Sequence, residues 1–176
     1  NKPWATPLPF PVQVVDKVEV IDHVSQTKLV TTYAYHHGYF DGHEREFRGF
    51  GRVDQLDTET FENFSQVGLH GADVAVSNVD SAFHAPPVLT KNWYHTGAYL
   101  DDEQTLAAHY RHEFWQKDGA AFVLEGHDVD PNRAAHRALR GSLLRSEVYA
   151  QDETAQAQHP YTVTEHRYQV EPIQAQ

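Results

Sequence analysis

Short runs of β-branched and aromatic residues, broken by turn-forming residues, recur along the chain and favour a mainly β fold. Residues 12–23 are dense in valine and isoleucine, and a second such run spans residues 28–35. Side chains of this kind suit a pleated, half-buried surface. The two runs therefore predict an antiparallel hairpin.

A second hairpin is predicted around the dipeptide Asp41-Gly42. Tyr39 and Phe40 precede this dipeptide, and the run 47–53 follows it. Glycine adopts positive φ at little cost, so Asp-Gly between two β-favouring runs indicates a tight turn. A third hairpin is predicted from residues 143–149 and 161–170 near the end of the chain.

Two stretches change to a helical period. Leu106, Tyr110 and Phe114 recur at helical spacing within residues 101–117. In residues 130–141 an aspartate stands at the capping position, a proline follows it, and Gly141 is placed to end the helix. The sequence thus predicts two short helices.

These elements predict a mainly β (α+β) fold of antiparallel hairpins with the two helices packed on the sheet. We expect one structural unit with four regions, namely a hairpin region at 1–62, a variable strand and loop region at 63–100, a two-helix region at 101–141 and a C-terminal hairpin at 142–176. The chain contains no methionine and opens with Asn1-Lys2-Pro3-Trp4, so we expect it to be cut from a larger protein.

Charge and composition argue against several classes of protein. The chain has 25 acidic and 14 basic residues and a net charge of -11, which disfavours nucleic acid and anionic membranes as partners. It has no cysteine, so disulfides and thiolate metal sites are excluded. No apolar run approaches the ~20 residues of a membrane span. We therefore expect no nucleic acid and no membrane contact.

The histidine-rich segment between His36 and Glu46 is the strongest candidate for a metal site, because imidazole and carboxylate groups bind zinc. Its candidate ligands are His36, His37, Asp41 and His43. Neighbouring residues on a strand point to opposite faces, so only one of the two adjacent histidines is expected to join a given cluster. We therefore expect no functional metal and no cofactor.

No catalytic residue is predicted elsewhere. His109 and His112 are spaced i and i+3, whereas the helices of zinc proteases carry histidines at i and i+4. Ser142 and Ser146 lack the G-x-S-x-G turn that exposes a nucleophile. The chain is not expected to be an enzyme.

Aromatic residues and glycines are instead expected to hold the sheet together. We expect Phe47 to face a core while nearby arginines and glutamates pair across strands. Gly49 and Gly51 are expected to mark a bulge or a close backbone approach, and truncating a buried aromatic residue should cost ~3–5 kcal/mol. The predicted structural residues are Tyr33, Tyr35, Tyr39, Phe40, Gly42, Phe47, Gly49, Phe50, Gly51, Trp93, Tyr94 and Gly141.

One long block carries a family resemblance. Residues 33–53, which read YAYHHGYFDGHEREFRGFGRV, resemble a hallmark stretch of the B component of insecticidal toxin complexes. Further similar blocks lie at 86–91, 93–97, 137–145, 147–150, 159–161 and 164–166. Together they look like the middle, C-proximal region of that component, before its Rhs or YD repeats.

The resemblance implies hairpins of the Rhs/YD-shell type and a non-catalytic role in a secreted, extracellular toxin complex. The shell would enclose a cytotoxic effector. The implied partners are the remainder of the same B component, the C component that completes the shell, and the A-component channel. Two other interpretations remain open, namely a metal-dependent hydrolase using residues 36–46 and a carbohydrate- or receptor-binding module.

Overall fold

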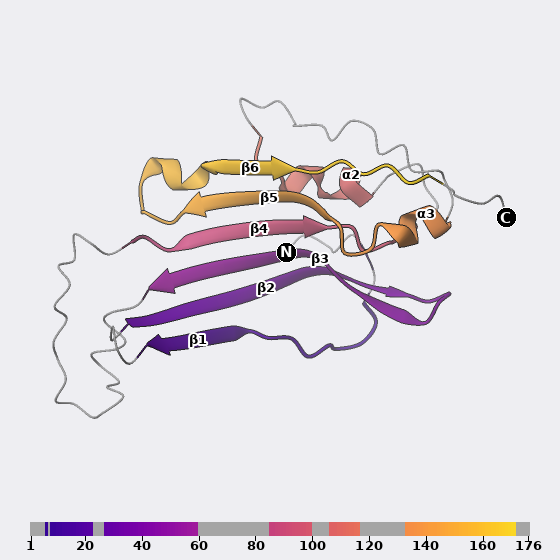
Figure 1. The fold of residues 1–176 in the computed structure, drawn as a ribbon, viewed down its shortest axis with the longest axis horizontal. Coiled ribbons are helices and arrows are strands. Elements are labelled where there is room, and N and C mark those ends of the chain that lie inside the picture. Colours follow the sequence, from indigo (N-terminus) through magenta and orange to yellow (C-terminus); the bar gives the residue numbers. More distant parts are fainter. Residues whose placement is uncertain are drawn as a thin grey trace.

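The computed structural model describes residue 6 and residues 8–22, 27–59, 85–99, 106–116 and 133–171. Within these residues one six-stranded sheet forms, with strand order β1-β2-β3-β4-β5-β6 (Figure 1). Its strands are β1 (Lys17–Asp22), β2 (Thr27–Asp41), β3 (Glu46–Glu59), β4 (Val88–Tyr94), β5 (Leu143–Ala150) and β6 (Thr162–Glu165). All neighbours pair antiparallel, which confirms the mainly β fold.

The strand β2 takes part in both predicted N-terminal hairpins. Its first part pairs with β1, with Lys17 opposite Thr32, and its residues from Leu29 to Asp41 pair with β3, with a register shift between Gly38 and Phe40. The turn between β2 and β3 begins at Gly42 of the predicted Asp-Gly signal, but its positive φ of 54° falls on Arg45 and not on that glycine. The third hairpin is looser than expected, because residues 151–161, including the turn η3 (Ala155–Gln158), separate β5 from a β6 that ends at Glu165.

The strand β4 lies in the middle of the sheet, although its residues belong to the region expected to be variable. It pairs with β3 on one side and with β5 on the other. Pro86 and Pro87 come directly before it. Proline lacks the N–H that a strand interior needs but is tolerated at a strand start, so this pair marks where β4 begins.

Helical residues occur inside both predicted ranges. The helix α2 (Leu106–Tyr110) continues into the turn η2 (Arg111–Glu113), and α3 (Arg133–Ala138) precedes β5. Gly141 follows α3 with a φ of 80°, the left-handed conformation common where helices end. Residues 101–105 and 117 of the first predicted range and residues 130–132 of the second lie outside the described part of the chain.

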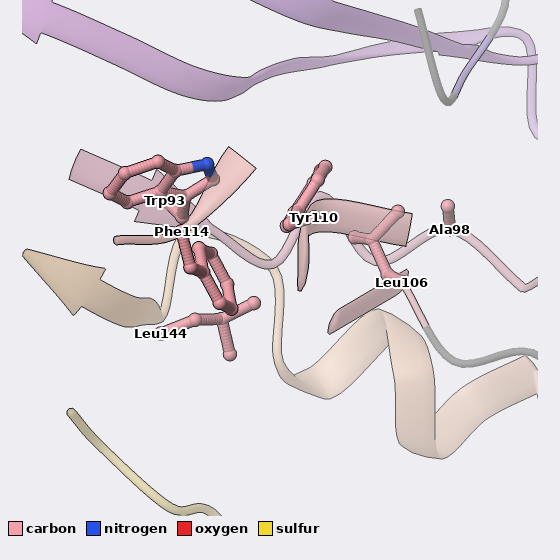
Figure 2. Packing of buried hydrophobic residues seen from close by; sticks show 6 residues of the cluster. All are labelled: Trp93, Ala98, Leu106, Tyr110, Phe114 and Leu144. Carbon is pink, nitrogen blue, oxygen red and sulfur yellow. The ribbon is translucent and has the colours of Figure 1, made fainter. Parts of the chain in front are cut away.

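The core lies between the sheet and α2. Six buried residues form it, namely Trp93, Ala98, Leu106, Tyr110, Phe114 and Leu144 (Figure 2). The Trp93 and Phe114 rings meet edge to face, with centroids 5.0 Å apart. Because the helix-side residues recur every four positions, one stripe of α2, η2 and the following residue covers the sheet. We call the covered side of the sheet the helix face, and the side that carries Tyr33 and Tyr35 the aromatic face.

Candidate functional site: an ionic network on the helix face

Both adjacent histidines of β2 contact the same group of charges. His37 has a φ of 55°, a left-handed conformation that interrupts the alternation of the strand. His36 Nε2 lies 3.4 Å from Asp54 Oδ2, and His37 Nε2 lies 2.9 Å from Glu113 Oε1. The expectation that only one of the two histidines could join a given cluster is therefore wrong.

Arg52 connects the two carboxylates that the histidines face. Its Nε donates to Asp54 Oδ1 at 2.7 Å, and its Nη1 donates to Glu113 Oε2 at 3.2 Å. Trp93 Nε1 donates to the same Glu113 oxygen at 3.2 Å. The strand β3, the core tryptophan of β4 and the turn η2 are thus joined by one set of hydrogen bonds.

The pKa values of these two carboxyl groups reflect their partners. Burial opposes ionisation of Asp54, but His36 and Arg52 outweigh it and lower the pKa to about 2. Burial likewise opposes ionisation of Glu113, and the contacts with His37, Trp93 and Arg52 lower its pKa to about 2. Both groups are therefore charged across the physiological pH range.

A second set of charges lies on β5. Arg145 and Glu147 are both fully buried, and Arg145 Nε donates to Glu147 Oε1 at 2.6 Å. Arg145 also pairs with Glu165 of β6. The backbone N–H of Trp115 donates to Glu147 Oε1 at 2.9 Å, and the Tyr149 hydroxyl donates to the other Glu147 oxygen. This set attaches the segment after η2 to the sheet.

A third set organises the turn between β2 and β3. Asp41 is buried, and its Oδ1 accepts the backbone N–H groups of His43 at 2.9 Å and Glu44 at 3.1 Å. Arg48 Nη2 lies 2.9 Å from Asp41 Oδ2, and Arg48 Nη1 donates to Gly97 O at 2.9 Å. Burial opposes ionisation of Asp41, but the two N–H groups and Arg48 hold its pKa below the usual value.

Arginines on and just after α3 face the acidic residues of this turn. Arg137 Nη1 lies 3.7 Å from Glu44 Oε1, and Arg140 pairs with Glu46. The helix α3 and the turn lie at the same end of the sheet (Figure 1). These arginines are well exposed, so each pair contributes less than ~1 kcal/mol.

The structure does not bring the four candidate metal ligands together. Asp41 binds Arg48 and two backbone N–H groups, while His43 lies exposed in the turn, 3.7 Å from Glu44. The two other histidines face Asp54 and Glu113, as described above. Among the described residues no group of three or more His, Asp or Glu side chains could hold a metal ion. In the same part of the chain, no helix is long and apolar enough to span a membrane.

Most of the predicted aromatic packing residues lie away from the core. Tyr35 and Phe50 are half-buried, with ring centroids 4.8 Å apart, on the aromatic face. They line an open groove of about 730 Å³ together with Tyr33, Ala34, residues 8–12, Val14 and Asp16. The residues Tyr33, Phe40, Phe47 and Tyr94 are half-buried as well, Tyr39 packs against the core cluster, and Trp93 belongs to it.

The pattern expected around Phe47 is reversed in the structure. Arg48 is buried, whereas Phe47 and Phe50 are only half-buried. The physical reason is that both terminal nitrogens of the Arg48 guanidinium are paired, Nη2 with Asp41 and Nη1 with the carbonyl of Gly97, and a paired charge tolerates burial.

The predicted glycines occupy different environments. Gly49 has a φ of 93° where the register between β2 and β3 shifts. A Cβ atom added at Gly51 would lie 1.9 Å from the Tyr110 hydroxyl oxygen. Gly42 lies exposed in the turn, with no atom within 4 Å of an added Cβ. A strained backbone thus explains Gly49, and a close contact explains Gly51.

Several residues of the network had not been predicted. The sequence predicts a helix around Glu113, where His109 and His112 lack the zinc-protease spacing, and a strand around Arg145 and Glu147. The alternation of Arg145, Glu147 and Tyr149 marks them as one face of a strand. A polar alternation normally indicates a solvent-exposed face, so no local signal showed that this face is buried.

Comparisons with known proteins are consistent with this fold. The family described as insecticide toxin TcdB middle/N-terminal region matches residues 1–71, and the family described as its middle/C-terminal region matches residues 134–176. Together they match more than half of the chain. The strands β1, β2 and β3 fall in the first match and β5 and β6 in the second, while β4 belongs to neither and joins them. No curated protein matches the chain.

Solved toxin structures match almost the whole chain. A crystal structure of TcdB2-TccC3 is 34% identical, with a TM-score of 0.69, and the match covers 95% of this chain and 8% of that one. A TcdB2-TccC3 structure without its hypervariable C-terminal region is 35% identical, with a TM-score of 0.67 and coverages of 91% and 7%. The Tc holotoxin pore of Photorhabdus luminescens is 34% identical, with a TM-score of 0.67 and coverages of 91% and 7%.

The fold and these matches define a β-sheet segment of a toxin-complex protein. The chain belongs to the middle region of the toxin-complex B component, the TcdB family. It spans less than a tenth of the length of the solved chains that it matches.

Proposed function

We propose that this chain is a non-catalytic structural segment of a toxin-complex B component and forms part of an Rhs/YD-type β-sheet shell. The shell encloses a cytotoxic effector and helps to deliver it. One observation carries the proposal: carboxylates of the helix face are held by arginines, as in the half-buried Asp54 with Arg52 and the buried Glu147 with Arg145. Charges paired in this way fix strands and helices to each other.

The proposed partners follow from the relatives. One solved relative is a TcdB2-TccC3 pair, and another is a Tc holotoxin pore. We therefore propose that the segment works within its full-length B component, that this B component pairs with a C component, and that the assembly docks on an A-component channel. The assembly is proposed to be a secreted virulence factor.

Reconstitution of the full-length B component with a C component that carries its effector tests the proposal. We expect the assembly to protect the effector from added protease, and B component alone to give no protection. Glu113→Gln, which removes a charge but keeps the size of the side chain, should lower thermal stability and leave both protection and delivery intact.

A catalytic role makes the opposite prediction for the same variant. The non-catalytic assignment would fail if the Glu113→Gln assembly formed normally and protected the effector but delivered no active effector. A metal-dependent hydrolase using the segment 36–46 would in addition lose its activity in chelator, whereas a structural segment should be unaffected.

A further inference from the structure

The strand β1 lies at one edge of the sheet and pairs only with β2 among the described strands. Natural edge strands are commonly protected by charged side chains, by proline, by a bulge or by being very short, and of these devices β1 carries charged side chains at Lys17, Glu19 and Asp22. The six residues of β1 contain no proline, and their register with β2 runs without a shift from Lys17 opposite Thr32 to Asp22 opposite Thr27. The edge of β1 is therefore a regular, unbroken strand edge.

The aromatic face is also exposed and apolar at this edge. Val18 is 40% exposed and Val20 is 57% exposed, and Leu29, directly opposite Val20 on β2, is 50% exposed. Phe10, Val14 and Val15, in the segment that leads into β1, are exposed as well. These six are most of the large exposed hydrophobic residues in the described part of the chain, and such clustering marks an interaction surface.

The other face of β1 is charged. Lys17 Nζ lies 2.7 Å from Glu19 Oε1, and Lys28 Nζ of β2 lies 3.1 Å from Glu19 Oε2. The edge therefore presents Val18 and Val20 on one side, followed by Asp22, and Lys17 and Glu19 on the other, followed by Ile21. A strand that matched it would alternate apolar and polar side chains in the same way.

We propose that β1 is a docking edge, on which a strand from another segment of the same full-length B component pairs and extends the sheet. The inference rests on the proposed function, because it assigns the neighbour of this segment within the shell. The docking strand places apolar side chains beside Val18 and Val20 and polar or charged side chains beside Lys17 and Glu19.

The neighbour is assigned to the same polypeptide for two reasons. The solved relatives of this chain are more than ten times its length, as the chain covers only 7–8% of each, so most of the protein is available to supply a strand. A segment tethered in the same chain also has a high effective concentration and avoids most of the entropy cost of association.

Hydrogen exchange on the full-length B component tests the docking edge. In an antiparallel edge strand, alternate N–H groups bond to the neighbouring strand and the others point outward. With exchange resolved to single amides, we expect the outward N–H groups of residues 17–22 to exchange at least ~100-fold more slowly than unprotected amides. Unprotected exchange of these outward amides in the full-length protein would overturn the proposal.

Variants separate the docking edge from general stability. Val20→Lys, at a side chain that is already 57% exposed, should speed exchange of the outward β1 amides at least ~10-fold and leave those of β3 and β4 unchanged. Val163→Lys on β6, the opposite edge strand, is the matched control and should leave β1 exchange unchanged.

The source of the docking strand is tested in the same experiment. Protection of β1 that appeared only after addition of the C component would assign the strand to that partner and overturn the intramolecular assignment. Because exchange is measured without an effector, loss of effector enclosure alone would count against the proposed shell function and would leave the docking edge standing.

Discussion

Gly51 and Tyr110 meet where β3 passes under α2, and a methyl group has no room between them. A Cβ atom at position 51 would lie 1.9 Å from the Tyr110 hydroxyl oxygen and 3.1 Å from the Cβ of His37. We therefore expect Gly51→Ala to lower the free energy of unfolding by about 1–3 kcal/mol. Gly42→Ala, in the exposed turn, is the control and should be close to neutral in denaturant unfolding.

The Tyr110 hydroxyl provides a second test of this contact. It is buried and has no hydrogen-bond partner among the described residues, and burial raises its pKa. Tyr110→Phe removes the oxygen, so it should be neutral or stabilising alone and should restore part of the loss in Gly51→Ala. Strictly additive effects of the two changes would show that the contact is not the cause.

Trp93 and Phe50 are both predicted from the sequence as packing residues, but their alanine variants should differ in stability. Trp93 is fully buried in the core, whereas Phe50 is half-buried on the aromatic face. In thermal unfolding, Trp93→Ala should lower the free energy of unfolding by about 3–5 kcal/mol, and Phe50→Ala should lower it by roughly half as much. Equal losses would mean that the aromatic face is as tightly packed as the helix face.

At the scale of elements, the network around Arg52 makes the attachment of η2 sensitive to strong acid. Asp54 and Glu113 have pKa values of about 2, below their ordinary values of 3.8 and 4.5. Stability from a lowered pKa is fully present above the ordinary value and is lost as the pH falls toward the folded-state value. We expect the free energy of unfolding to fall by about 2–4 kcal/mol between pH 5 and pH 2. This is less than the two pKa shifts would give separately, because the carboxylates share Arg52 and are partly exposed to solvent.

Unfolding measured over this pH range checks the assignment. The double variant Asp54→Asn with Glu113→Gln should be less stable at pH 7 and should show a flatter decline between pH 5 and pH 2. A decline as steep as that of the unmodified protein would place the responsible carboxyl groups elsewhere. Glu153→Gln, at an exposed position after β5, is a control that should preserve the steep decline.

The elements that sequence predicts well are those fixed by neighbours in the chain. The turn after Asp41 follows from a local dipeptide, and the core stripe of Leu106, Tyr110 and Phe114 follows from local spacing. The ionic network could not be predicted, because Arg52 meets Glu113, and Glu147 meets Trp115, only after distant parts of the chain are assembled. The placement of His37 also escaped prediction, since its left-handed backbone removes the strand alternation on which the expectation relied.

On the scale of the whole molecule, β4 holds the two halves of the sheet together. It is the strand between the two family matches, and it pairs with β3 and β5. Thr90→Pro, in the middle of β4, removes a backbone N–H from a central strand, so it should cost at least ~3 kcal/mol.

Thr90→Val keeps the backbone N–H and the β-branched shape, so it isolates the backbone effect and should cost little. Circular dichroism during thermal unfolding measures both variants. If Thr90→Pro unfolded at the same temperature as Thr90→Val, the two halves of the sheet would be stable without continuous pairing through β4.

The buried charges of the helix face also act as a check on strand alignment. Slipping β5 by one residue against β4 would turn Arg145 and Glu147 to the opposite side of the sheet, away from the backbone of Trp115 that they bind. An apolar face would tolerate many such misalignments. Buried charges that lose their partners instead cost several kcal/mol. The polarity of this interior thus favours a single correct assembly over near-miss alternatives.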